Sequence, residues 1–211
     1  MKQRFFLSVL LMIQCFLSVW SQNISMKDSI TVSYEFPKDK FLYMFMEYQK
    51  VYALDVIVKS TKRDLFYGID MVRYTDGQVK REHLTEKHLL KLDTLNHFYC
   101  FAQASSNDTA HIAIMHPIYS EWNIPINTQN CILMETLPLH AYATADTIPL
   151  IAYTTGHEVT IEWNGQPAKA IDFCGVRYSK KHPSEWHKAF NLKDYLYFEL
   201  ILSPRKKDTE Q

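Results

Sequence analysis

Hydrophobic and polar residues alternate with a period of two in several stretches of this 211-residue chain, most clearly at 54–59, 158–163 and 195–202. Successive side chains of a β-strand point to opposite faces of a sheet, so this pattern predicts strands with one face on a core and the other toward solvent. In 158–163 we expect the apolar Val159, Ile161 and Trp163 to form the core-facing set.

Turn-forming sequences separate the predicted strands at 75–77, 105–108 and Asn164-Gly165, and the last of these is the strongest hairpin signal. Three hairpins in series favour antiparallel pairing over βαβ units. The 13 Tyr and 12 Phe residues suit pleated surfaces as well. We therefore predict a mainly β fold, an antiparallel β-sandwich with one or two short helices.

Helical spacing of apolar residues occurs in two short stretches, 84–92 and 183–192, with Ser184 as the expected N-cap of the second. Four other aromatic residues fall on or near the polar faces of predicted strands: Tyr43, Tyr48, Tyr195 and Tyr197. Exposed aromatic rings on a sheet can stack on sugars or cover a protein partner, whereas half-burial is the structural alternative.

The N-terminus has the layout of a secretory signal peptide. Lys2 and Arg4 precede an apolar run at 5–19, and compact residues at 19 and 21 lead to Gln22. The alternative is an uncleaved anchor, but the run is shorter than the roughly 20 residues of a membrane span. We expect residues 1–21 to be removed and the mature protein to be exported (periplasmic, cell-surface or secreted) with no transmembrane span after cleavage.

The rest of the chain divides into a β-rich domain at 22–203 and a charged, frayed tail at 204–211. Prolines and a polar tract gather within 117–149, which is where the domain would divide if it held two β subdomains.

Composition excludes several classes of protein. Lys plus Arg equals Asp plus Glu, at 23 each, so the basic surplus needed for phosphate contacts is missing and no nucleic-acid partner is expected. The mature chain keeps Cys100, Cys131 and Cys174 without C-x-x-C spacing, which argues against structural zinc. An odd number of cysteines leaves at least one free thiol, and Cys100–Cys131 is the pairing we would choose if one disulfide forms.

No local motif for catalysis or cofactor binding is present. The chain lacks H-E-x-x-H, G-x-S-x-G, a P-loop and a dinucleotide-binding loop, so we predict no metal, no cofactor and no identifiable catalytic residue. A hydrolase whose carboxylate and His residues come from separate strands stays open, with Glu121 and Glu185 as the carboxylate pair to nominate.

Two segments, 116–122 and 182–186, each place His-Pro ahead of Ser-Glu-Trp. The candidate ligand-binding residues are therefore Trp122 and Trp186 for stacking, with Glu121 and Glu185 to orient hydroxyls or amides. The alternative is that both tryptophans are core residues.

Four triplets read Asp, then Ser or Thr, then an aliphatic residue, and their hydroxyl residues are Ser29, Thr94, Thr109 and Thr147. The triplet resembles the O-glycosylation acceptor of exported Bacteroidetes proteins, and the leader is similar to theirs. The resemblance implies an exported glycoprotein with these four hydroxyls accessible.

The sequence favours a non-enzymatic module of the cell envelope that binds a glycan or protein partner, or assists assembly. The hydrolase is the alternative, and a small-ligand carrier with a barrel interior is a third option.

Overall fold

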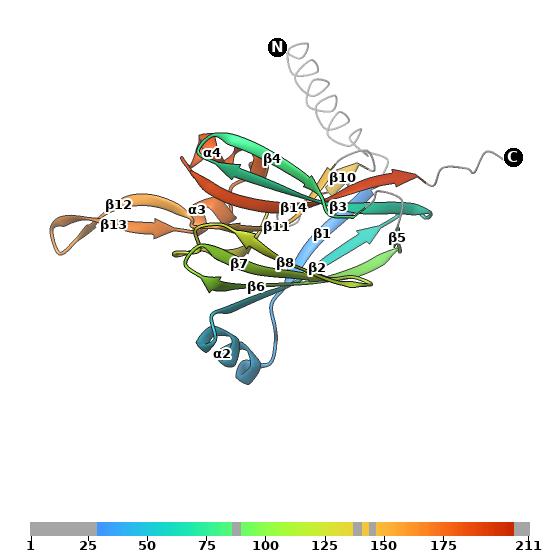
Figure 1. Cartoon of the computed structure of the whole chain (residues 1–211), viewed down its shortest axis with the longest axis horizontal. Helices are drawn as coiled ribbons and strands as arrows, with labels where there is room; N and C mark the ends of the chain where they lie inside the picture. Colours follow the sequence, from blue (N-terminus) through green and yellow to red (C-terminus); the bar gives the residue numbers. More distant parts are fainter. Residues whose placement is uncertain (1–28, 86–89, 137–140, 144–146, 205–211) are drawn as a thin grey trace, which may run out of the picture.

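The computed structural model describes residues 29–85, 90–136, 141–143 and 147–204 (Figure 1). These residues form mainly antiparallel β-sheets with a few short helices, which confirms the predicted β-sandwich. The proposed signal peptide and residues 205–211 of the proposed tail lie outside the described residues, and those predictions stay predictions.

The first sheet has six strands, all antiparallel to their neighbours. In spatial order they are β10 (Ala141–Ala143), β1 (Ser29–Glu35), β2 (Val51–Ser60), β6 (Leu95–Ser106), β7 (Thr109–Met115) and β8 (Tyr119–Pro125).

The second sheet runs in the order β4 (Gln78–His83), β3 (Leu65–Thr75), β14 (Asp194–Pro204), β11 (Thr147–Thr154) and β9 (Ile132–Glu135). The short β5 (Leu90–Leu92) also pairs with β3. β3, from before residue 117, pairs along its whole length with β14, from after residue 149, so strands from both sides of the proposed boundary lie side by side in one sheet.

Two apolar cores flank the second sheet. The larger one lies between the sheets and includes Val56, Phe98 and Phe198. The smaller one lies on the outer face of the second sheet, where Tyr195 and Tyr197 are buried together with Trp186.

The cover of this outer face is the short helical segment α3 (Cys174–Arg177), η2 (Pro183–Glu185) and α4 (Trp186–Ala189). Tyr195 and Tyr197, for which the sequence left exposure and half-burial open, are therefore neither exposed nor half-buried but fully buried. Tyr195 even donates its hydroxyl hydrogen bond to the Pro183 carbonyl, at 2.7 Å.

Of the two predicted helical stretches, one is helical in part and the other is not helical where the structure describes it. Residues 183–192 do contain η2 and α4, although His182, not Ser184, caps the segment by accepting the Ser184 N–H. In the stretch 84–92 the helix prediction is wrong where the structure describes it, because Leu90–Leu92 forms β5 and Leu92 is buried against the core. Residues 86–89 lie outside the described part.

A helix that the sequence reading missed, α2 (Lys40–Tyr48), joins β1 to β2. Asp39 is its N-cap, and its carboxylate accepts the Leu42 N–H at 2.8 Å. Tyr43 and Tyr48, which we expected near the faces of strands, belong to this helix.

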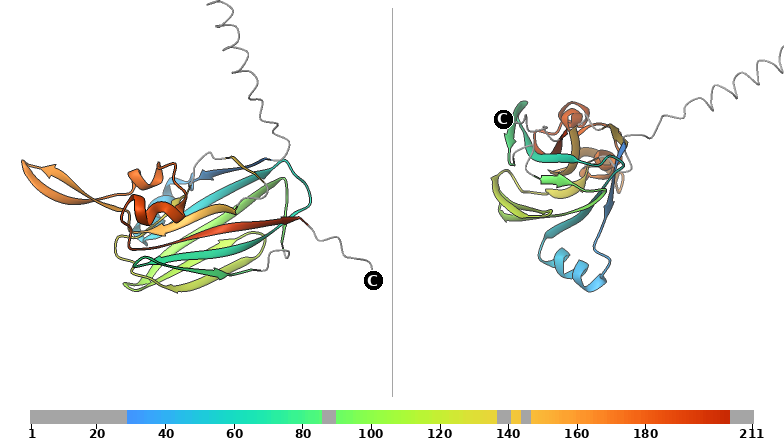
Figure 2. Two further views of the ribbon diagram at one scale, coloured as in Figure 1. Left: turned by 90° about the horizontal axis from the view of Figure 1, so that it is seen from above. Right: turned by 90° about the vertical axis from the view of Figure 1, so that its right-hand side faces the viewer.

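The Asn164-Gly165 hairpin is confirmed as β12 (His157–Trp163) and β13 (Gln166–Asp172), a separate two-stranded sheet. Both turn residues have positive φ, 52° and 74°, as the tight hairpin turn requires. The hairpin projects from the sandwich (Figure 2), so its apolar set does not face a core: Ile161 and Trp163 are 40% and 66% exposed.

The three cysteines in the described part of the chain are free, so the Cys100–Cys131 pairing does not form. Cys100 and Cys131 are buried as thiols, and Cys174 is exposed. Among the described helices none is long and apolar enough to cross a membrane.

Candidate functional site

The helix α2 stands away from the sandwich on the two segments that connect it to β1 and β2 (Figures 1 and 2). None of its residues is buried, although seven of the nine are apolar or aromatic. A surface helix usually turns its apolar stripe to the core, and α2 departs from that rule.

Its most exposed apolar side chains form one continuous stripe. They are Phe41, Met44, Phe45 and Tyr48, with exposed fractions of 83%, 70%, 54% and 82%. Positions i, i+3, i+4 and i+7 lie on the same face of a helix. We call this set the α2 stripe; it faces away from the rest of the described chain.

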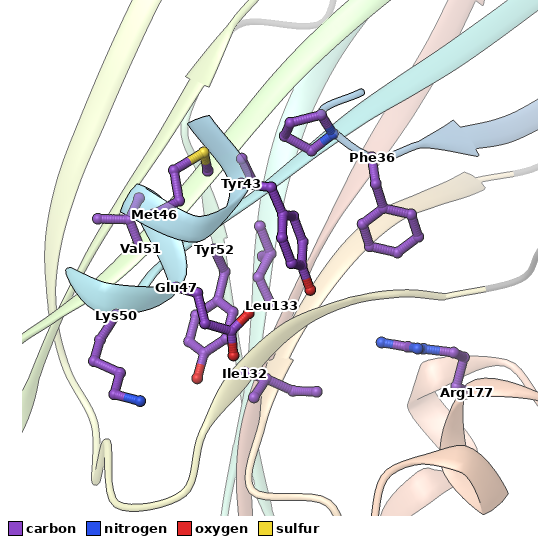
Figure 3. A pocket seen from close by; sticks show the side chains of 12 residues that line it. Phe36, Tyr43, Met46, Glu47, Lys50, Val51, Tyr52, Ile132, Leu133 and Arg177 are labelled. Carbon is purple, nitrogen blue, oxygen red and sulfur yellow. The ribbon is translucent and has the colours of Figure 1, made fainter. Parts of the chain in front are cut away.

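The opposite side of α2 borders a cavity of about 330 Å³ (Figure 3), which we call the α2 cavity. Tyr43, Met46 and Glu47 contribute the wall from the helix. The other walls come from β2, β9, the segment before α2, the turn between α2 and β2, and α3: Val51, Tyr52, Ala53, Ile132, Leu133, Phe36, Pro37, Lys50 and Arg177.

Three charged side chains border this mostly apolar cavity. Glu47 and Lys50 lie on the α2 side, whereas Arg177 points its guanidinium toward the cavity from α3. The Nε of Arg177 lies 2.9 Å from Oε2 of the buried Glu135, close enough for an ion pair, although the two atoms are not aligned for a hydrogen bond. Burial raises the pKa of Tyr52, and the nearby Glu47 charge adds to the effect, so its phenol remains a hydrogen-bond donor.

The structure does not bring the predicted ligand-binding residues together. Trp122 lies in β8 and packs inward on Phe198, with ring centroids 5.5 Å apart. Glu121 precedes it on the same strand and is exposed on the opposite face, where it accepts the Tyr119 hydroxyl at 2.6 Å. A tryptophan and a carboxylate on opposite faces of a strand cannot hold one ligand.

Trp186 lies on the other side of the sandwich, in the smaller core. It is fully buried and its indole N–H donates to the Lys181 carbonyl at 3.1 Å, while Glu185 is exposed. In this conformation the indole of Trp186 offers no face to a ligand.

The four candidate glycosylation hydroxyls lie at the surface. Thr94 and Thr147 are exposed, and Ser29 and Thr109 are half-buried. Glycosylation itself stays a prediction.

A carboxylate and histidine cluster is assembled from separate strands of the second sheet. Asp70 and Glu199 are directly opposite each other on β3 and β14, and both are buried. Nη1 of Arg81 on β4 donates to both carboxylates, at 3.0 Å to Asp70, and the Nδ1 of His83 lies 2.7 Å from the Asp70 Oδ1. Burial raises the pKa of Glu199, and the Arg81 charge opposes this.

Sequence reasoning missed this cluster, although a signal existed in the single carboxylate of the apolar run around Asp70. None of its four side chains lines the α2 cavity. In the described ranges no group of three or more His, Cys, Asp or Glu residues is arranged to hold a metal ion.

Comparison with known proteins identified no relative of this chain. No known protein family matches the chain, and no curated protein and no solved structure does so either.

Proposed function

We propose that this protein is an exported, non-catalytic binding module that attaches to a protein partner by inserting the α2 stripe into an apolar groove of that partner. The observation that carries the proposal is the outward direction of the stripe on a helix with no buried residue. The N-terminal leader pattern supports export.

The spacing of the stripe is the one used when a helix docks in a groove, with anchors at i, i+3, i+4 and i+7. Each large apolar side chain contributes about 1.5–3 kcal/mol when it is fully removed from water. Four such side chains, Phe41, Met44, Phe45 and Tyr48, lie on α2 without an intramolecular contact that buries them. Docking in a groove supplies that burial.

Charge favours a protein groove over a lipid surface. Interfacial helices that bind membranes have a polar face rich in Lys and Arg. The segment from Glu35 to Lys50 carries three acidic and three basic residues, so it offers no net attraction to anionic lipids. The stripe offers the hydroxyls of a glycan a single hydrogen-bonding group, the phenol of Tyr48.

Area favours a groove over a second copy of the same stripe. Aromatic side chains bury about 150–250 Å² each, so the partly exposed stripe offers on the order of 600 Å². A stable interface needs about 800 Å² on each partner. A groove that wraps the helix can also cover Leu42, which is 48% exposed and does not line the α2 cavity.

Site-specific photo-crosslinking in the native cells tests the proposal. We expect a crosslinker at position 44, on the stripe, to form an adduct with one discrete protein, and one at position 118 to form none. Ile118 is the matched control because it is an exposed apolar residue outside α2. A lipid adduct, an adduct with a second copy of the chain, or no adduct at position 44 would each overturn the proposal.

The identified partner then allows a titration. Phe41→Ala should weaken binding of the partner by at least ten-fold, since a buried Phe contributes about 1.5–3 kcal/mol. Ile118→Ala should leave the affinity unchanged. Equal affinities of the two variants would show that the stripe is not the contact.

The hydrolase remains the second candidate, because Asp70, Arg81, His83 and Glu199 do gather from separate strands. A carboxylate that orients an imidazole is an arrangement used in general-base catalysis. Hydrolysis of ester or glycoside substrates by the purified protein, lost in His83→Ala, would favour this candidate. Activity that survives His83→Ala would exclude this cluster as its source.

A further inference from the structure

We infer that the α2 cavity is a binding site for a compact apolar carboxylate, whose acid group pairs with Arg177 and whose apolar body lies between α2 and the sandwich. The site is separate from the α2 stripe, because the stripe and the cavity lie on opposite sides of the helix. The inference therefore goes beyond the proposed function and does not depend on it.

Size sets the first limit on the ligand. The cavity of about 330 Å³ lies at the lower end of the range for small-molecule sites, roughly 300–1,000 Å³. One water molecule occupies about 30 Å³ in the liquid, so the cavity accommodates on the order of ten heavy atoms. A medium-length acyl chain or a single ring with a short tail fits this limit.

The walls determine the apolar part of the ligand. Phe36 and Tyr43 form an aromatic side, visible in Figure 3, and Met46 and Leu133 add flexible and aliphatic surface. Ligand sites combine such apolar walls with a few polar groups that fix orientation. Methionine adapts its shape to an apolar guest because its side chain is unbranched and polarizable.

The polar end of the site is Arg177. Its Nε lies 2.9 Å from Oε2 of Glu135 without a hydrogen bond between them, and in the described part of the chain no carboxylate other than Glu135 forms an ion pair with Arg177. A guanidinium presents its donors in one plane, and this fork geometry suits a carboxylate. Among the residues that line the cavity, Lys50 and Glu47 carry opposite charges at the α2 end, which leaves Arg177 as the lining cation available to an acid group.

A ligand in this position would contact α2 and the sandwich at once. Tyr43 and Met46 belong to the helix, whereas Tyr52 and Leu133 belong to β2 and β9. Because a ligand that binds only the assembled site stabilises it by mass action, the bound state should hold α2 against the sandwich more firmly. Hydrogen exchange of the α2 amides should slow on binding.

Calorimetric titration of the purified mature protein tests the inference. The probes are octanoate and 3-phenylpropionate, each compared with the alcohol and the amine of the same carbon skeleton. We expect both acids to bind at least ten-fold more tightly than their alcohols and amines. Absence of acid binding, or equal binding of acid and alcohol or of acid and amine, would overturn the inference.

Two substitutions on one helix locate the site. Met46→Trp fills the cavity and should abolish acid binding, while Met44→Trp, two residues away on the stripe, should leave it unchanged. Binding that persists in Met46→Trp, or that is lost equally in both variants, would place the acid elsewhere.

A third variant tests the polar end without leaving a charge unpaired. The double substitution Arg177→Gln with Glu135→Gln neutralises both partners of the ion pair. The affinity for octanoate should fall at least ten-fold, to the level of octanol, whereas the affinity for octanol should not change. An unchanged octanoate affinity in a folded double variant would refute the role of Arg177.

Discussion

Two short helical connections of this protein differ in whether they bury their apolar side chains. The segment of η2 and α4 buries Trp186 completely over the second sheet. The helix α2 is richer in apolar residues, yet it buries none of them. Hydrophobicity of a connection therefore does not decide whether it packs; the surface opposite the connection does.

The reason lies in what each segment covers. The outer face of the second sheet carries Val72, Tyr195 and Tyr197, and these side chains need a cover that α4 supplies through Trp186. Beneath α2 there is the α2 cavity, so Tyr43 and Met46 meet a hollow instead of a packed core. We interpret the packed segment as a structural cover and the unpacked helix as a contact surface.

The largest expected effect is on the packed side. Trp186→Ala should lower the free energy of unfolding by about 3–5 kcal/mol, because it leaves a large cavity in the smaller core. Urea denaturation at pH 7 measures this loss. A loss below about 1 kcal/mol would mean that the segment of η2 and α4 contributes as little to stability as α2, and the contrast between the two segments would be wrong.

The next effect concerns the edge strand β4, which Arg81 attaches to two buried carboxylates. Arg81→Gln should cost about 2–3 kcal/mol at pH 7, since Asp70 and Glu199 lose their cation while buried. The pKa of Glu199 is already raised in the folded protein by burial, and losing Arg81 raises it further.

The raised pKa of Glu199 also predicts how the stability loss in Arg81→Gln changes with pH. A carboxyl whose pKa is raised on folding binds its proton more tightly in the native state, so its destabilising effect is relieved as the pH falls. The stability difference between Arg81→Gln and the parent should therefore shrink between pH 7 and pH 5 in urea titrations. A difference that grows toward pH 5 would contradict the assigned role of Glu199. The exposed Lys80→Gln on the same strand serves as the control.

A smaller difference in stability is expected between substitutions in two hairpin turns, the one that joins β3 to β4 in the sandwich and the one that joins β12 to β13 in the projecting hairpin. Gly77 and Gly165 both have positive φ in two-residue turns, at 82° and 74°, and an added Cβ meets no atom within 4 Å at either position. Gly77→Ala should cost about 1–2 kcal/mol of global stability, because the left-handed conformation is unfavourable for Ala. Gly165→Ala should change the global value by less than about 0.5 kcal/mol, because the β12–β13 hairpin lies outside both cores.

Equal effects of the two substitutions on the urea midpoint would show that the projecting hairpin belongs to the cooperative unit. Amide exchange in β12 and β13 provides the local readout: it should accelerate in Gly165→Ala and stay unchanged in Gly77→Ala.

The smallest effect is expected on the α2 stripe. Phe41→Ala should change the free energy of unfolding by no more than about 0.5 kcal/mol, because an exposed side chain loses little on truncation. The same variant is the one expected to weaken partner binding. A stability loss similar to that of Trp186→Ala would show that Phe41 packs inside the molecule, and the contact interpretation would fail.

The local patterns of the sequence were sufficient for the β class, for the hairpin at Asn164-Gly165 and for the strand at 195–202. These features depend on neighbouring residues: the period of two reflects the pleat, and the two turn residues adopt positive φ without distant help. The helix α2 was within reach of the same reasoning, since Asp39 and the spacing of Phe41, Met44, Phe45 and Tyr48 were in view.

Only the tertiary structure decided which faces are covered. Tyr195 and Tyr197 alternate as an outward set, yet they are buried because a segment from earlier in the chain folds over them. Val159, Ile161 and Trp163 have the same alternation, yet none of them is buried: Val159 is half-buried, and Ile161 and Trp163 are exposed on the projecting hairpin. The period of a strand defines two faces, but burial requires a second surface, and the sequence period contains no information about where that surface comes from.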